Sequence, residues 1–88
     1  MRRRARVDAN QAEIVEALRA LGVSVQSLAS VGDGCPDLLC GYRGRNILLE
    51  VKAPKGDTTS DQWTWGARWR GQMAIVRSVE DARRALGR

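Results

Sequence analysis

The sequence predicts a small α/β fold in which a central mixed β-sheet is flanked by helices, with the element order α-β-β-β-α-β-α. Three features predict this fold: a helical apolar period near the N-terminus, two apolar runs around a short glycine-containing break, and a short apolar strand between two further helical segments. The 88 residues fit one small domain. We expect this domain to span residues 9–88 and to follow a flexible basic tail at residues 1–8.

The first helix is predicted over about residues 9–21, because apolar side chains recur there at the spacing of one helix face. Asp8 and Gln11 have the spacing of a capping box at its start, and Gly22 follows as the residue that ends it. A short strand is expected next, over residues 23–28, where apolar and polar residues alternate.

A β-hairpin is predicted over about residues 38–52, where two apolar runs flank the break at residues 41–45. The rest of the chain is predicted to hold a loop, a helix, a strand and a final helix. In chain order these are a loop at residues 53–57, a helix that Thr59 or Ser60 caps and that ends before Gly71, a strand at residues 73–76, and a helix that Ser78 caps and that ends near Leu86.

The charge of the chain favours a polyanionic partner. Fifteen Lys and Arg residues oppose ten Asp and Glu residues, which gives a net charge of +5. Thirteen of the fifteen are Arg, which binds phosphate in a bidentate manner, so we expect the partner to be nucleic acid. Lys55 is either a solvated loop charge or a phosphate contact. The Arg residues of the tail are either solvated or a phosphate clamp: Arg2, Arg3, Arg4 and Arg6.

Residue types that are missing exclude several chemistries. The chain has no His, so hydrolysis by Ser-His-Asp or Cys-His sites and by His-based nuclease sites is excluded. Cys35 and Cys40 are too few for a structural zinc site, and on one strand they would lie about 16 Å apart, too far for a disulfide. No secretory signal or membrane span of about 20 apolar residues is visible. We therefore expect a cytoplasmic protein with no membrane partner. The small size and the composition suit a protein of a bacterial or phage-infected cell.

The predicted hairpin brings three ionisable side chains together. If residues 43–44 form its two-residue turn, the residue numbers of each facing pair sum to 87. Asp37 and Glu50 then face each other, with their Cβ atoms about 4.5–5.5 Å apart. Lys52 lies two positions beyond Glu50 and therefore points to the same face.

Facing carboxylates repel each other, and a bound divalent cation removes the repulsion. Mg²⁺ and Mn²⁺ suit such a site, because hard cations prefer oxygen ligands and Mg²⁺ retains several waters. The main-chain carbonyl of Val51 could supply a further oxygen. We therefore expect Asp37 and Glu50 to bind Mg²⁺ or Mn²⁺ beside Lys52. The plainer interpretation is an exposed end of the sheet that carries ordinary charges.

Two segments of the chain, Gly34–Leu39 and Leu48–Lys52, resemble the motifs of the PD-(D/E)XK nucleases. The resemblance is narrower to the VRR-NUC and archaeal-type Holliday junction resolvase branches, and it covers about residues 10–82. It implies a restriction-endonuclease-like core and two further catalytic residues. Glu13 fits the acidic residue of the first helix in these families, and Gln62 fits a Gln in the helix after the Lys motif.

Both of these residues have plainer alternatives. Glu13 could be a solvated helix residue, and Gln62 could complete a capping box with Thr59. The junction resolvases also carry an active-site Ser after the first strand, for which Ser27 and Ser30 are both candidates, and the Arg often found there is missing. Three Trp residues share the predicted second helix, and we expect them to pack in the core or at a dimer interface rather than to stack on bases: Trp63, Trp65 and Trp69.

The resemblance implies a metal-dependent DNA endonuclease that hydrolyses phosphodiester bonds in branched or structured DNA, such as four-way junctions, as a homodimer. Asp37 and Glu50 would bind the metal, with Glu13 reaching it through water. Lys52 would orient or help to deprotonate the attacking water, and Gln62 would position Lys52, water or phosphate. The alternatives are a nicking or flap-type nuclease without junction selectivity, and an inactive DNA-binding module.

Overall fold

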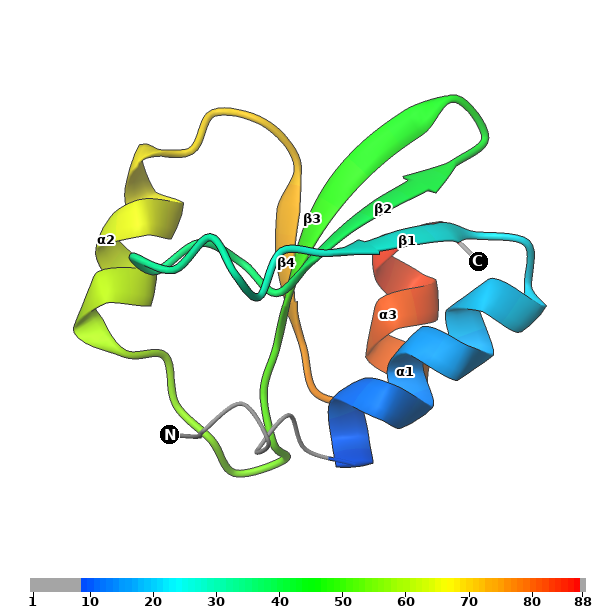
Figure 1. Cartoon of the computed structure of the whole chain (residues 1–88), viewed down its shortest axis with the longest axis horizontal. Helices are drawn as coiled ribbons and strands as arrows, with labels where there is room; N and C mark the ends of the chain where they lie inside the picture. Colours follow the sequence, from blue (N-terminus) through cyan, green and yellow to red (C-terminus); the bar gives the residue numbers. More distant parts are fainter. Residues whose placement is uncertain (1–8, 88) are drawn as a thin grey trace.

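The computed structural model of the chain describes residues 9–87, which form one four-stranded sheet with helices on both sides (Figure 1). The predicted order α-β-β-β-α-β-α is confirmed. The elements are α1 (Ala9–Ala20), β1 (Ser24–Ser27), β2 (Leu38–Tyr42), β3 (Arg45–Val51), α2 (Ser60–Arg68), β4 (Met73–Val76) and α3 (Val79–Ala85).

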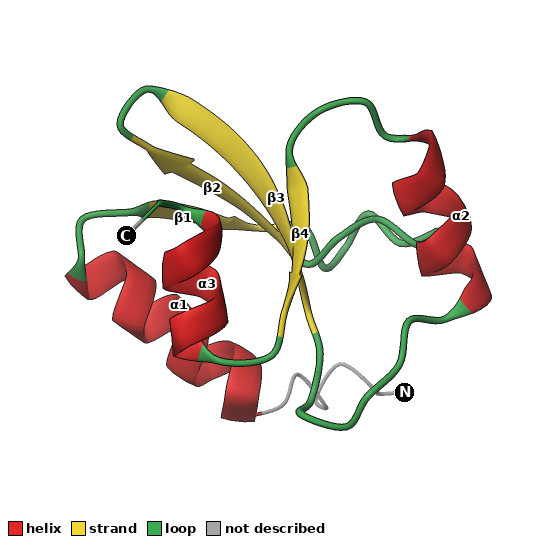
Figure 2. Cartoon of the chain, turned by 180° about the vertical axis from the view of Figure 1, so that it is seen from behind, coloured by secondary structure: helices red, strands yellow, loops and turns green. Residues whose placement is uncertain are grey.

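The sheet is mixed and follows the order of the chain, β1-β2-β3-β4. The pairs β1–β2 and β2–β3 are antiparallel, whereas β4 pairs with β3 in parallel. A parallel partner needs a crossover connection, and α2 lies in that connection. Figures 1 and 2 show α1 and α3 together on one side of the sheet and α2 on the other.

The turn of the β2–β3 hairpin sets its register. Arg43 and Gly44 both have positive φ, at 52° and 78°, as a two-residue type I′ hairpin turn requires. Tyr42 therefore pairs with Arg45, and the ladder runs on to the pair Leu38–Leu49. The predicted register, in which paired residue numbers sum to 87, is confirmed.

The hydrophobic core lies between the sheet and the two helices α1 and α3. Ile14 and Leu18 of α1 are fully buried there, together with Ala82 of α3. Burying one such Leu or Ile side chain stabilises the fold by about 1.5–3 kcal/mol. The sheet contributes the alternate side chains that face these helices: Leu38, Cys40, Ile47, Leu49, Val51 and Val76.

The opposite face of the sheet is covered less completely, because no residue of α2 is buried. Trp63 is 68% exposed and Trp69 is 46% exposed. Trp65 is half-buried and stacks on Trp69, with 4.7 Å between the ring centroids. Trp63 and Trp69 therefore do not pack in the core, which leaves a dimer interface and base stacking as the alternatives for them. The apolar side chains of the amphipathic helix α2 lie at the protein surface rather than in its interior.

The remaining expectations concern the first strand, the two cysteines, membrane spans and the N-terminal tail. The first strand is shorter than predicted and covers only Ser24–Ser27. Cys35 and Cys40 are both free thiols. Within residues 9–87, no helix is both long enough and apolar enough to cross a bilayer. The tail, with its Arg residues at positions 2, 3, 4 and 6, and the proposed cap at Asp8 lie outside the described residues.

Candidate active site

Asp37 lies directly before β2, one position beyond the last pair of the β2–β3 ladder. By the same register it stands across from Glu50. Its Oδ2 accepts a hydrogen bond from the main-chain N–H of Val51 at 2.7 Å. Its own main-chain carbonyl accepts one from the N–H of Leu28 at 2.8 Å. The carboxylate of Asp37 is therefore held by the backbone of β3, and its main chain is held by the segment after β1.

Glu50 is buried in the middle of the site. It lies on the side of the sheet that faces α2 and is only 2% exposed. Its Oε2 accepts a hydrogen bond from the Gln62 amide at 2.7 Å and lies 3.6 Å from the Lys52 ammonium. Its Oε1 is buried and has no hydrogen-bond partner among the described residues. An unpartnered buried carboxylate oxygen is costly, and it is the kind of atom that a cation would satisfy.

The surroundings of Glu50 change its acidity. Burial, together with a smaller contribution from the Asp37 carboxylate, raises the pKa of Glu50 from 4.5 to about 7 against the opposing effect of Lys52. Burial, and after it the Glu50 and Asp37 carboxylates, also raise the pKa of the Cys35 thiol. The site therefore carries more negative charge than its single Lys offsets.

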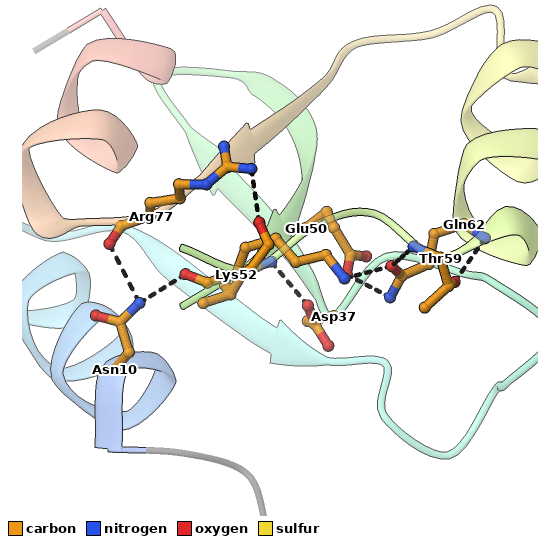
Figure 3. A network of polar contacts seen from close by, with 9 residues as sticks. Asn10, Asp37, Glu50, Lys52, Thr59, Gln62 and Arg77 are labelled. Atoms are coloured by element: carbon orange, nitrogen blue, oxygen red, sulfur yellow. Dashed lines mark hydrogen bonds and ion pairs between the residues drawn. The ribbon is translucent and has the colours of Figure 1, made fainter. Parts of the chain in front are cut away.

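Lys52 follows the end of β3, and both ends of the residue are held. Its main-chain N–H donates to the carbonyl of Val76 at 2.9 Å, which continues the parallel pairing with β4. Its ammonium donates to Oε1 of Gln62 and faces Glu50 (Figure 3). Asp37, Glu50 and Lys52 thus converge, as the register predicts.

Gln62 joins the acidic and basic sides of the site. Its amide nitrogen donates to Glu50, while its Oε1 accepts from Lys52 and from the main-chain N–H of Thr59 at 2.9 Å (Figure 3). Its own N–H donates to the Thr59 hydroxyl at 3.2 Å, which completes a capping box. The capping role expected for Gln62 is therefore confirmed, and the same side chain also contacts Lys52 and Glu50.

A close backbone contact brings α2 to the site. Gly34, at φ +86°, lies so near the first turn of α2 that a Cβ there would stand 2.4 Å from the carbonyl oxygen of Asp61. Only glycine fits such a position without a shift of backbone. The loop that carries Asp37 and the helix that carries Gln62 can therefore lie against each other. The Gly of the Gly34–Leu39 segment was a visible signal for this contact.

Other predicted residues lie at the margins. The side chain of Glu13 is exposed on α1, and that of Lys55 is exposed in the loop after Lys52. Val51 is buried at the end of β3. Ser27 forms a local turn, because its hydroxyl accepts from the N–H of Ala29 at 3.2 Å.

Two residues that hold the backbone near Lys52 were not foreseen. The Asn10 amide nitrogen donates to the main-chain carbonyls of Lys52, at 2.8 Å, and Arg77, at 3.2 Å. The Arg77 guanidinium donates to the carbonyl of Gly56 at 2.9 Å. These bonds join positions that are distant in sequence, so no local sequence pattern predicts them.

No protein-family model, curated protein or solved structure matches this chain. The interpretation of the site therefore rests on its own residues and their geometry.

The donor set suits a hard divalent cation. Asp37 and Glu50 offer oxygens only, and Glu50 lines a cleft of about 490 Å³ that opens along α2. Residues 9–87 hold no cluster of three or more His, Cys, Asp or Glu that would enclose a metal completely. Two carboxylates with water completing the shell are the usual arrangement for Mg²⁺, whereas a structural zinc site needs four protein ligands.

Proposed function

We propose that this protein is a Mg²⁺- or Mn²⁺-dependent endonuclease that hydrolyses phosphodiester bonds in DNA. The observation that carries the proposal is the convergence of Asp37, Glu50 and Lys52 around a buried carboxylate oxygen that lacks a partner. Asp37 and Glu50 would hold the cation, and the main-chain carbonyl of Val51 is proposed as a third ligand. A bound cation in such a site polarises phosphate and lowers the pKa of water.

The protein's own groups have separate tasks. Lys52 orients the attacking water or assists its deprotonation, and its charge offsets the charge that develops on the phosphate. Gln62 fixes the Lys52 ammonium through the hydrogen bond between them and through its second bond to Glu50. Thr59 holds Gln62 in turn. Glu13 belongs to the proposal only as an outer residue that acts through water.

The proposed substrate is branched or structured DNA, and the reaction is placed in the cytoplasm of a bacterial or phage-infected cell. The net charge of +5 favours a nucleic acid partner. The Arg-rich tail and Lys55 are the proposed phosphate contacts. A nicking or flap-type nuclease without junction selectivity would use the same site.

The decisive experiment compares Asp37→Ala, Glu50→Ala and Lys52→Ala with the wild type and with Glu16→Ala, a control at an exposed position of α1. Each site variant should lose cleavage while it still binds DNA, and EDTA should stop the wild type. Wild-type cleavage by purified Glu50→Ala would refute the assignment. An inactive wild type that still binds DNA would identify a binding module.

A second measurement addresses the substrate. Linear, nicked, flapped and four-way DNA of the same sequence should be compared with Mg²⁺ and with Mn²⁺. Faster cleavage of the four-way junction supports the branched substrate. Equal cleavage of nicked, flapped and four-way DNA would favour the nicking or flap-type alternative.

We also propose that the protein works as a homodimer, because two sites related by a two-fold axis can cut two strands. Large apolar side chains stay exposed on α2 and on the sheet beside it, and a chain of this size buries too little surface to be robust alone. These side chains are Leu39, Trp63, Trp69 and Ile75. We propose that a second copy of the chain covers these side chains.

Sedimentation velocity at micromolar concentration tests this assembly. The wild type should sediment as a dimer, and Trp63→Ser with Trp69→Ser should shift it to monomer. A monomeric, active wild type would remove the paired-cut proposal. If the Trp variants then bind single-stranded DNA more weakly, the indoles stack on bases instead.

A further inference from the structure

Asn10 ties the N-terminal helix to the backbone of the candidate active site. One amide nitrogen, in the first turn of α1, donates to the carbonyls of Lys52 and Arg77, which lie 42 and 67 positions away. Both hydrogens of that amide are therefore used for contacts outside the helix (Figure 3). A capping side chain accepts from helix N–H groups, whereas these two bonds are donated away from α1.

The two carbonyls mark the ends of the parallel strands β3 and β4. Lys52 follows β3 and donates its N–H to Val76, the last residue of β4. Arg77 follows β4, and its guanidinium donates to Gly56 in the loop after Lys52. The main chain around Lys52 is thus held on its N–H side by β4, on its carbonyl side by Asn10, and beyond it by Arg77.

A lysine is a long, flexible side chain, so its ammonium stays in place only when both ends are fixed. Gln62 holds the ammonium of Lys52 at the tip. The Asn10 bond holds the carbonyl at the base. Displacement of a catalytic group by about 1 Å can reduce a rate on the order of 100-fold.

We propose that Asn10 is a positioning residue for Lys52, and that it acts by clamping the ends of β3 and β4 together. This inference rests on the proposed nuclease function. Asn10 does not touch the substrate in this proposal. Its effect reaches the reaction only through the placement of the Lys52 backbone.

The test compares Asn10→Ala and Asn10→Asp with Asn46→Ala, a matched Asn control at an exposed position of β3. Single-turnover cleavage at saturating DNA, DNA affinity without metal, and amide hydrogen exchange should be measured for each. Asn10→Ala should cleave on the order of 10- to 100-fold more slowly with unchanged DNA affinity. Exchange at the Lys52 amide should rise while exchange at the Leu49 amide in the core stays slow.

Asn10→Asp separates the loss of the donor from the loss of volume. Its carboxylate cannot donate to the two carbonyls, but its protonated form can donate to one of them. The cleavage rate of Asn10→Asp relative to Asn10→Ala should therefore rise as the pH falls. Asn46→Ala should match the wild type in all measurements.

Two outcomes would overturn the positioning role. One is wild-type cleavage by Asn10→Ala. The other is a loss of cleavage accompanied by equally faster exchange at Lys52 and Leu49, which would assign Asn10 to global stability. A wild type that cleaves no DNA would instead overturn the proposed function, and the exchange at Lys52 would separately decide whether Asn10 holds this segment.

Discussion

Replacing Glu50 by Gln keeps the size of a buried side chain and removes its charge. Burial and, to a smaller extent, the Asp37 carboxylate raise the pKa of Glu50 from 4.5 to about 7, although Lys52 opposes the rise. Between pH 4.5 and 7 the folded protein therefore keeps a proton on Glu50 that the unfolded chain has released. Without divalent metal, the stability of the wild type should fall as the pH rises through this window.

The size of the effect follows from the two pKa values. At 1.36 kcal/mol per pKa unit, the difference between 4.5 and about 7 amounts to about 3 kcal/mol. Because Glu50 is 2% exposed, solvent screens little of it. This is a large part of the roughly 5–15 kcal/mol that stabilises a typical domain. Glu50→Gln should exceed the stability of the wild type by less than about 1 kcal/mol at pH 5 and by about 3 kcal/mol at pH 8.

Urea unfolding in EDTA, followed by Trp fluorescence at pH 5 and pH 8, measures this difference. The midpoint of Glu50→Gln at pH 8 should lie on the order of 1–3 M above that of the wild type. Added Mg²⁺ or Mn²⁺ should stabilise the wild type at pH 8 and leave the variant nearly unchanged. Glu16→Gln, at an exposed position, is the matched control. A wild type whose stability is flat or rises between pH 5 and 8 would refute the reasoning.

Three further predictions concern the neighbours of Glu50 and the tail. Asp37→Asn, which removes one of two facing carboxylates, should melt higher than the wild type in EDTA by an amount equivalent to about 1 kcal/mol, and a lower melting temperature would contradict a shared site. Thr59→Ala should destabilise α2 by about 1 kcal/mol in thermal melts and slow cleavage, because the main-chain N–H of Gln62 loses the Thr59 hydroxyl; unchanged cleavage would show that this cap does not position Gln62 for the reaction. Deletion of residues 1–6 should flatten the slope of log affinity for DNA against log salt concentration by about 0.9 for each phosphate that the tail binds in the wild type. An unchanged slope would show that the tail does not bind phosphate.

The fold and the centre of the site were predictable because they follow from local patterns. Helical spacing and capping residues located the helices, and the turn at Arg43 and Gly44 set a register that carries over to Asp37 and Glu50. A hairpin register is decided by neighbouring residues, so it can be worked out without tertiary information.

The remaining features depend on contacts between distant segments. The burial of Glu50 requires α2 to cover it, and the bonds of Asn10 require β3, β4 and α1 to meet. The exposure of Trp63 and Trp69 also had no local signal, since a Trp-rich amphipathic helix usually predicts a buried face. Sequence patterns describe what each segment can do, and the packing of segments decides what it does.

The parallel pairing of β3 with β4 has a consequence for the synthesis of the protein. The hairpin that carries Asp37, Glu50 and Lys52 can form early on the ribosome, because its strands are neighbours in sequence. The Lys52 backbone, however, obtains its support from Val76 and, through Asn10, is joined to Arg77. A nascent chain that ends before these residues has both carboxylates but an unsupported lysine. Under the proposed function, the newly made protein should therefore cleave no DNA until nearly all of its domain has emerged.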